Sequence, residues 1–248
     1  FEVAAPLTLL VPLPSAELWK ILLLATLGNG VYPFFLVGSC RYGDLGAVFP
    51  LARGIAPLGV LGLSWAYVGE PLTVARILCI AVIALGVASF AFDRGVLRSP
   101  AGRRGVVLAI ATGIIVAVYT VIDGIGLRVA VNPSTYIVWL FVLDGAFVSS
   151  CTLAARWRSA SSFFQRNWRM TLVGGVLGVL TYGLALFALA LGSVAEIAAL
   201  RETSIVFAAL IGTFFLGEAF GRRRVLAAVW VAAGVIGFSE RPNAAHGL

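Results

Sequence analysis

Apolar runs long enough to cross a lipid bilayer follow one another along almost the whole chain. A bilayer core of about 30 Å is crossed by roughly 20 apolar residues in a helix. The runs are continuous and do not alternate with a period of two, which excludes an outer-membrane β-barrel. Of the 248 residues, 60% are hydrophobic and only 12% are charged, too few charges to cover a soluble domain. The sequence therefore predicts an all-α, polytopic transmembrane helix bundle.

Polar breaks divide the chain into eight complete spans and one partial span. The run at residues 1–13 is too short to cross a bilayer, so we expect the chain to begin partway through a helix. The two longest connections, 93–104 and 155–169, are too short to hold a soluble domain. The complete spans are expected near 19–40, 46–69, 73–92, 105–127, 134–154, 170–192, 194–217 and 222–239.

Basic residues gather on one side of this arrangement. Twelve arginines fall in the loops of one face, against four basic residues on the other face and in the tail. Because cytoplasmic loops carry the excess of Lys and Arg, the first face is expected in the cytoplasm and the C-terminus outside. We expect a multi-pass protein of the bacterial cytoplasmic (inner) membrane, with cytoplasmic loops at 93–104, 155–169 and 218–224.

A repeat relates two parts of the chain that face opposite ways. Residues 47–90 align with 195–238 in a single register, and five spans, an odd number, separate the equivalent helix ends. Inverted repeats are typical of secondary transporters, whose substrate site lies near the midplane where the repeats meet. The most specific aligned pairs are Arg53 with Arg201, Gly69-Glu70 with Gly217-Glu218, Arg76 with Arg224, and Gly86-Val87 with Gly234-Val235.

Two segments of this repeat, GDLGAVFPLARGIAPLGVLGLSWAYVGE (43–70) and SVAEIAALRETSIVFAALIGTFFLGE (193–218), resemble the drug/metabolite transporter superfamily, specifically its EamA-type ten-helix members. The resemblance implies two five-helix repeats, here 1–92 and 105–239, with the first helix and part of the second missing. It implies transport of small metabolites, amino acids or drugs by an ion gradient or by exchange, without ATP hydrolysis. It also implies cytoplasmic termini, which conflicts with the arginine count.

Two arginines lie inside predicted spans, Arg53 and Arg201, and Glu202 follows the second. A mid-membrane arginine costs roughly 2.5–3.5 kcal/mol on insertion scales and normally faces a protein interior or a water-filled cavity. The pair could line a cavity and bind a carboxylate or phosphate, or each could be neutralised by a fixed carboxylate that locks the bundle. Glu202 has Gly54 as its counterpart, so it is a candidate both for substrate binding and for ion coupling.

Two more carboxylates are candidates for ion coupling. Asp144 lies near the middle of its span, and Asp123 lies near the end of another. A structural pairing with an arginine is the alternative for Asp144, and a place at the membrane interface is the alternative for Asp123. Aromatic residues that could form cavity walls, or simply pack, complete the candidate substrate-binding set: Tyr32, Tyr119, Trp139 and Tyr182.

Enzyme classes find little support in the sequence. The one histidine, His246, lies in the polar tail, and the one lysine, Lys20, lies at a helix edge, so neither can supply a catalytic pair deep in a span. We expect no catalytic residues, cofactor, metal or nucleic acid partner. The expected partners are a small anionic or zwitterionic, amino-acid-like substrate and the lipid bilayer; a coupling proton and a homo-oligomer stay open. A multidrug or cationic-compound exporter, a channel and a non-transporting scaffold are the alternatives.

Overall fold

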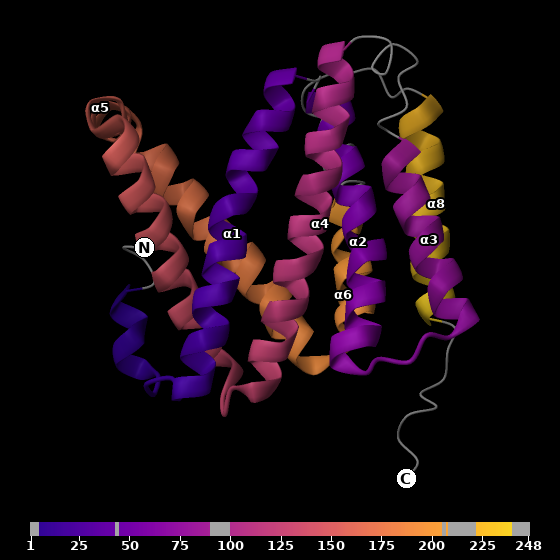
Figure 1. Cartoon of the computed structure of the whole chain (residues 1–248), viewed down its shortest axis with the longest axis horizontal. Coiled ribbons are helices and arrows are strands. Elements are labelled where there is room, and N and C mark those ends of the chain that lie inside the picture. Colours follow the sequence, from indigo (N-terminus) through magenta and orange to yellow (C-terminus); the bar gives the residue numbers. More distant parts are fainter. Residues whose placement is uncertain (1–4, 43–44, 90–99, 205–206, 208–221, 240–248) are drawn as a thin grey trace. The chain divides into compact units, whose positions relative to one another are not determined.

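The fold is helical throughout the part of the chain that the structure describes. The structure is a computed structural model and describes residues 5–42, 45–89, 100–204, 207 and 222–239. Five of its helical segments are long and apolar enough to cross a membrane, which confirms the predicted helical membrane protein. In chain order the elements are η1 (Ala5–Leu10), α1 (Ala16–Tyr42), α2 (Leu45–Val68), α3 (Val74–Ala88), α4 (Pro100–Val129), α5 (Pro133–Leu191), α6 (Val194–Arg201) and α8 (Arg222–Ser239) (Figure 1).

The predicted boundaries differ from the helices in three regions. The partial span at 1–13 contains a short 3-10 helix, Ala5–Leu10, and not an α-helix. The predicted loop at 93–104 overlaps the start of α4 at Pro100, and its residues 93–99 lie outside the described residues. The predicted span at 194–217 begins with α6, and most of its remainder also lies outside them.

The largest correction concerns α5, which continues through the predicted loop at 155–169. That stretch contains neither glycine nor proline, so its backbone has no helix-breaking residue although its arginines make it polar. The helix starts where Asn132 caps it by accepting from Ser134 N at 3.0 Å, with Pro133 in the first turn. Figure 1 shows the ribbon turning back where α5 is labelled. The membrane-length segments Pro133–Thr152 and Phe164–Leu191 therefore run in opposite directions.

The chain divides into two compact units. Unit 1 comprises residues 1–31 and 122–192, and unit 2 comprises 32–121 and 193–248. Each unit therefore takes residues from both of the predicted repeats, and α1 and α4 each contribute to both units.

Unit 2 is built around the packing of α2, α3, α6 and α8 (Figure 1). The Glu70 carboxylate caps α6, accepting from Ser193 Oγ at 2.7 Å, Val194 N at 2.7 Å and Ala195 N at 3.3 Å. A carboxylate at a helix N-terminus meets the free N–H groups and the positive end of the helix dipole. The glycine–glutamate motif at the end of one repeat therefore fixes the start of a helix in the other.

A second charged contact joins the same two parts of unit 2. Arg76, in the first turn of α3, lies 2.7 Å from the Glu196 carboxylate through Nη2 and donates to it from Nε at 2.8 Å. It also donates to the Pro71 carbonyl at 2.9 Å, which ties the α2–α3 connection to the start of α6. Both nitrogens contact the same carboxylate oxygen, Oε1, so the pair combines an ion pair with a charge-assisted hydrogen bond.

In unit 1, α1 packs in parallel against the first segment of α5. The rings of Trp19 and Trp139 are in edge contact at 5.1 Å, and further along both helices Gly30 lies against Phe147. Residue numbers increase together on the two helices, so they run in the same direction. Gly30 is required here because a side chain at its position would collide with the Phe147 ring.

Candidate functional site

Five of the predicted site residues gather in unit 2, and we call them the ionic cluster: Tyr32, Arg53, Tyr119, Arg201 and Glu202. Arg53 comes from α2, and Glu202 ends α6. The charges of both arginines and of Glu202 act on the Tyr32 hydroxyl, and the Tyr32 ring contacts Tyr119 at 6.1 Å. The sequence predicted these residue types as cavity-lining candidates, and the fold brings them to one place.

The centre of the ionic cluster is a buried ion pair. Arg53 Nε lies 3.1 Å from Glu202 Oε2, and the two side chains are 18% and 3% exposed. Arg53 also lies over the Phe49 ring, 5.9 Å from its centroid. Glu202 sits at the C-terminal end of α6, where the helix dipole disfavours a negative charge, so the neighbouring guanidinium compensates for both burial and position.

This pairing decides one question that the sequence left open. Glu202 could have paired with its neighbour Arg201 or with a group on another helix, and its ion-pair partner is Arg53 on α2. The mid-span arginine of the first repeat thus meets the carboxylate that only the second repeat carries.

The backbone of α2 is weakened beside this ion pair. Pro57 lies inside the helix, four residues after Arg53, and has no N–H to donate to the Arg53 carbonyl. In a membrane such a break in the helix ladder persists where other groups can satisfy the backbone. The break places a deformable point of α2 at the residue that holds Glu202.

The remaining site candidates lie in unit 1 together with three further polar residues, and we call the whole set the carboxylate cluster: Thr26, Asn29, Asp123, Tyr136, Trp139, Asp144 and Tyr182. Asp123 on α4 is completely buried and accepts from Tyr136 Oη at 2.8 Å and from Tyr182 Oη at 2.6 Å. Tyr182 Oη also lies 3.4 Å from Asn29 Oδ1. Two phenol donors therefore hold one completely buried carboxylate between three segments of the unit.

Asp144 occupies a different environment in the same cluster. Its carboxylate lies beside Thr26 of α1 and within range of the Asp123 charge. Its Oδ1 atom is buried and has no hydrogen-bond partner among the described residues. Trp139 Nε1 is also buried and also has no hydrogen-bond partner among the described residues.

Three members of the carboxylate cluster were missed from the sequence: Thr26, Asn29 and Tyr136. Threonine and tyrosine are common in membrane helices, and neither stands out in a hydropathy profile. Asn29 offered a signal, because an amide within the apolar stretch GNGVYP needs hydrogen-bond partners once it is buried. Pro33, four residues later, also removes the helical donor to the Asn29 carbonyl.

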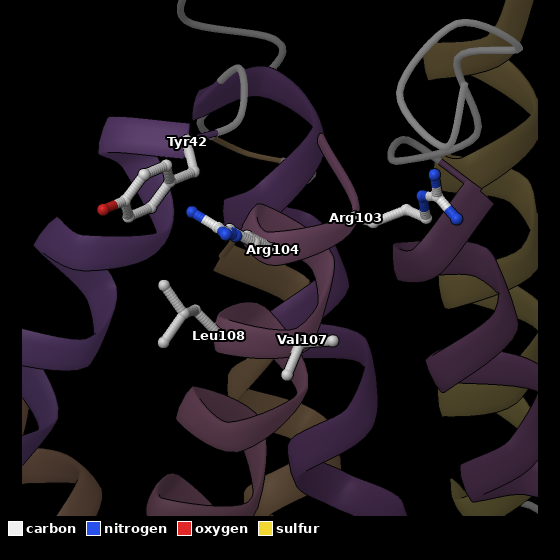
Figure 2. A pocket seen from close by; sticks show the side chains of 5 residues that line it. All are labelled: Tyr42, Arg103, Arg104, Val107 and Leu108. Atoms are coloured by element: carbon white, nitrogen blue, oxygen red, sulfur yellow. The ribbon is translucent and has the colours of Figure 1, made fainter. Parts of the chain in front are cut away.

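A surface hollow of about 410 Å³ lies outside both clusters, between the end of α1 and the start of α4. It is lined by Tyr42, Arg103, Arg104, Val107 and Leu108. Figure 2 shows Arg104 directed toward the Tyr42 ring and Arg103 directed away from it. Exposed tyrosine and arginine at helix ends are typical anchors at a membrane interface, so we interpret this hollow as an interfacial feature.

Apolar helices of membrane-crossing length with charged groups buried among them define a multi-pass membrane protein. The EamA-like transporter family matches residues 103–239, more than half of the chain. The chain belongs to this family and is a membrane transporter.

Comparison with solved structures supports the fold. A crystal structure titled only "Crystal structure of protein" aligns over 89% of this chain and 76% of its own, with a TM-score of 0.71 and 18% sequence identity. The comparison with curated proteins finds no match. Within the described ranges, no group of three or more His, Cys, Asp or Glu residues could hold a metal ion.

Proposed function

We propose that this protein is a secondary transporter of a small anionic or zwitterionic, amino-acid-like metabolite, and that the ionic cluster binds the substrate. The single observation that carries the proposal is the buried Arg53–Glu202 ion pair with Arg201 next to Glu202 in sequence. An intramembrane charged group is costly and is typically retained along a substrate or ion pathway. The guanidinium of Arg53 can bind a substrate that brings a carboxylate.

The substrate would act by exchanging partners within the cluster. A substrate carboxylate that binds Arg53 competes with Glu202, and the ammonium group of a zwitterion then offers Glu202 a new partner. Such an exchange replaces a direct link between α2 and α6 by a link through the substrate. Tyr32 and Tyr119 supply aromatic surface and hydroxyl groups beside it.

Alternating access is the mechanism that we propose for the two inverted repeats, 1–92 and 105–239, powered by an ion gradient or by exchange. The Arg53–Glu202 pair joins one repeat to the other, and Pro57 leaves α2 deformable beside it. Loading the site therefore changes the contact between repeats at a point where the helix can bend.

A second candidate function is the export of organic cations, favoured by the two aspartates and the aromatic side chains of the carboxylate cluster. The two functions differ in the substrates that they accept. Uptake into proteoliposomes from panels of radiolabelled amino acids, carboxylates and quaternary ammonium compounds separates them.

The first test replaces Arg201 by alanine in the full-length protein. Losing one charged hydrogen bond costs about 1.5–3 kcal/mol, which raises the half-saturating substrate concentration by roughly 10- to 100-fold. Initial rates in proteoliposomes give this constant, and Arg166→Ala is the matched control because Arg166 is exposed. Unchanged transport by Arg201→Ala refutes the site; loss of the folded protein assigns Arg201 a structural role instead.

A further inference from the structure

The α1–α5 contact in unit 1 contains a carboxylate oxygen and a hydroxyl that lie beside one another without completing a hydrogen bond. Thr26 is 6% exposed and lies next to the Asp144 carboxylate. Neither Thr26 Oγ1 nor Asp144 Oδ1 has a hydrogen-bond partner in the described part of the chain. Leaving a buried polar atom unpaired costs about 1–3 kcal/mol, more for a charged group, so a binding event at this place has free energy to gain.

Asp123, in the same unit as Asp144, is a carboxylate with a hydrogen-bond donor for each of its oxygens. Both of its oxygens accept from phenols, Tyr136 at 2.8 Å and Tyr182 at 2.6 Å. The Tyr182 hydroxyl has one hydrogen and donates it in the hydrogen bond to Asp123. The Asn29 amide is therefore best oriented with Nδ2 toward the Tyr182 oxygen. This orientation also gives the buried nitrogen a hydrogen-bond partner. The resulting chain of donors ends on Asp123 and satisfies both of its oxygens.

Asp144 has only the Thr26 hydroxyl beside it and feels the charge of Asp123. Two carboxylates that act on each other in a poorly solvated place do not both hold a negative charge easily. The other titratable groups that face this place are Tyr136 and Tyr182 of α5. On α1, Glu17 and Lys20 are exposed near its start, and on α4 Arg128 donates to the Gly124 and Gly192 carbonyls.

The neighbouring unpaired atoms favour a proton over a metal cation. Besides Thr26 Oγ1 and Asp144 Oδ1, the buried atom of the cluster that stays without a partner among the described residues is Trp139 Nε1, which carries hydrogen. Sodium and similar cations require a shell of oxygen ligands, and N–H groups cannot join it. A proton needs only the single oxygen, Asp144 Oδ1.

We propose that Asp144 is the proton-binding residue that couples this transporter to a proton gradient, a role that rests on the transport function proposed above. A proton from one side of the membrane binds Oδ1, forms an O–H bond and cancels one charge between α1 and α5; it leaves as the same bond breaks toward the other side. Asp123 stays charged and keeps its two phenol donors. Thr26 is the positioning residue that lies against the carboxylate.

The direct test observes the proton itself and needs no substrate. Infrared difference spectra of the purified full-length protein, recorded during a pH titration, show the C=O band of a protonated carboxyl group. We expect one such band to disappear in Asp144→Asn and to persist in the matched control Glu17→Gln, an exposed position at the start of α1. A band that persists in Asp144→Asn overturns the proposal, whatever the protein transports.

Transport measurements then test coupling. Proteoliposomes containing a pH-sensitive dye and a transported substrate from the panel above report proton movement, and counterflow reports exchange without a gradient. We expect Asp144→Asn to lose proton-driven accumulation and to retain counterflow, and Asp144→Glu to restore accumulation. Loss of counterflow by folded Asp144→Asn would make Asp144 a substrate-binding residue, and sodium-dependent accumulation by the unaltered protein would replace the proton by sodium; both overturn the proposal.

Discussion

At the scale of single residues, Arg53 and Glu202 form a buried ion pair in unit 2, and each charge compensates the other. Glu202 is 3% exposed, so removing its partner leaves a buried charge. We expect Arg53→Ala to destabilise the protein by about 3–5 kcal/mol, the usual cost of breaking a buried ion pair. Thermal unfolding in detergent measures the change, with Arg169→Ala, which loses only a contact with exposed Trp168, as the control.

Removing both charges together separates stability from function. The variant Arg53→Met with Glu202→Leu replaces the pair by apolar side chains, a change that is often neutral or stabilising. Near-normal unfolding together with lost transport supports a binding role for the pair. Normal transport by the double variant would reduce the pair to a structural contact.

Sequence reasoning reached these residues because charge inside an apolar run is visible without a structure. Arg53, Arg201, Glu202, Asp123 and Asp144 are all of this kind. Their partners were not visible, because the fold alone decides that Glu202 meets Arg53 across α2 and α6 or that Tyr182 meets Asp123. Partners in membrane helices are set by packing between segments far apart in the chain, which one sequence does not reveal.

At the scale of helices, glycine marks where two backbones approach most closely. A Cβ atom at Gly113 of α4 would lie 2.7 Å from the Ala52 carbonyl oxygen and 3.0 Å from Ile55 Cβ on α2. The Gly174/Gly178 pair in GGVLG has the small-xxx-small spacing that is typical of close helix contacts. Among the described residues, nothing lies within 4 Å of a side chain built at either position.

This difference yields a paired prediction. Gly113→Ala forces α4 away from α2 and is expected to cost about 1–3 kcal/mol of stability, the usual range for overpacking. Gly178→Ala meets no neighbour and gains helix propensity, so we expect an unchanged or slightly higher melting temperature. Melting curves of both variants in the same detergent make the comparison; equal effects would contradict the α2–α4 contact.

The helices also show that a connection between two spans can itself be helical. The stretch 155–169 contains four arginines and lies where the chain turns back between two spans, yet its backbone belongs to α5. Arginine, alanine and glutamine are good helix formers, and the backbone leaves a helix most readily at glycine or proline. Hydropathy locates where a chain leaves the membrane, whereas glycine and proline locate where a helix ends, and here α5 ends at Gly192.

At the scale of the whole molecule, the sequence predicted a bundle of membrane-crossing helices, but not the way in which they associate. The predicted repeat rests on Arg53, Arg201 and the two glycine–glutamate motifs. The way in which the two predicted repeats pack was not visible in the sequence. Glu70 caps α6 and Arg76 binds Glu196, and both contacts link one predicted repeat to the other. Each compact unit likewise combines residues of both repeats.

Orientation in the membrane is the property on which two lines of sequence reasoning disagree. Twelve arginines against four basic residues place the start of α4 in the cytoplasm, whereas cytoplasmic termini, as the family resemblance implies, place it outside. The two ends of α4 offer exposed positions for a direct test, Ala101 and Val131. A background without Cys40, Cys79 and Cys151 lets single cysteines be introduced there.

We expect Val131→Cys to react with a membrane-impermeant maleimide on intact cells, and Ala101→Cys to react only after the membrane is opened. The reason is that each arginine near the start of α4, Arg103 and Arg104 included, gains from the electrostatics of the cytoplasmic side. Labelling of both variants after lysis confirms that each cysteine is reachable. The reverse pattern would place the arginine-rich ends outside. That result would support the cytoplasmic termini that the family resemblance implies, and the orientation predicted from the arginine count would be wrong.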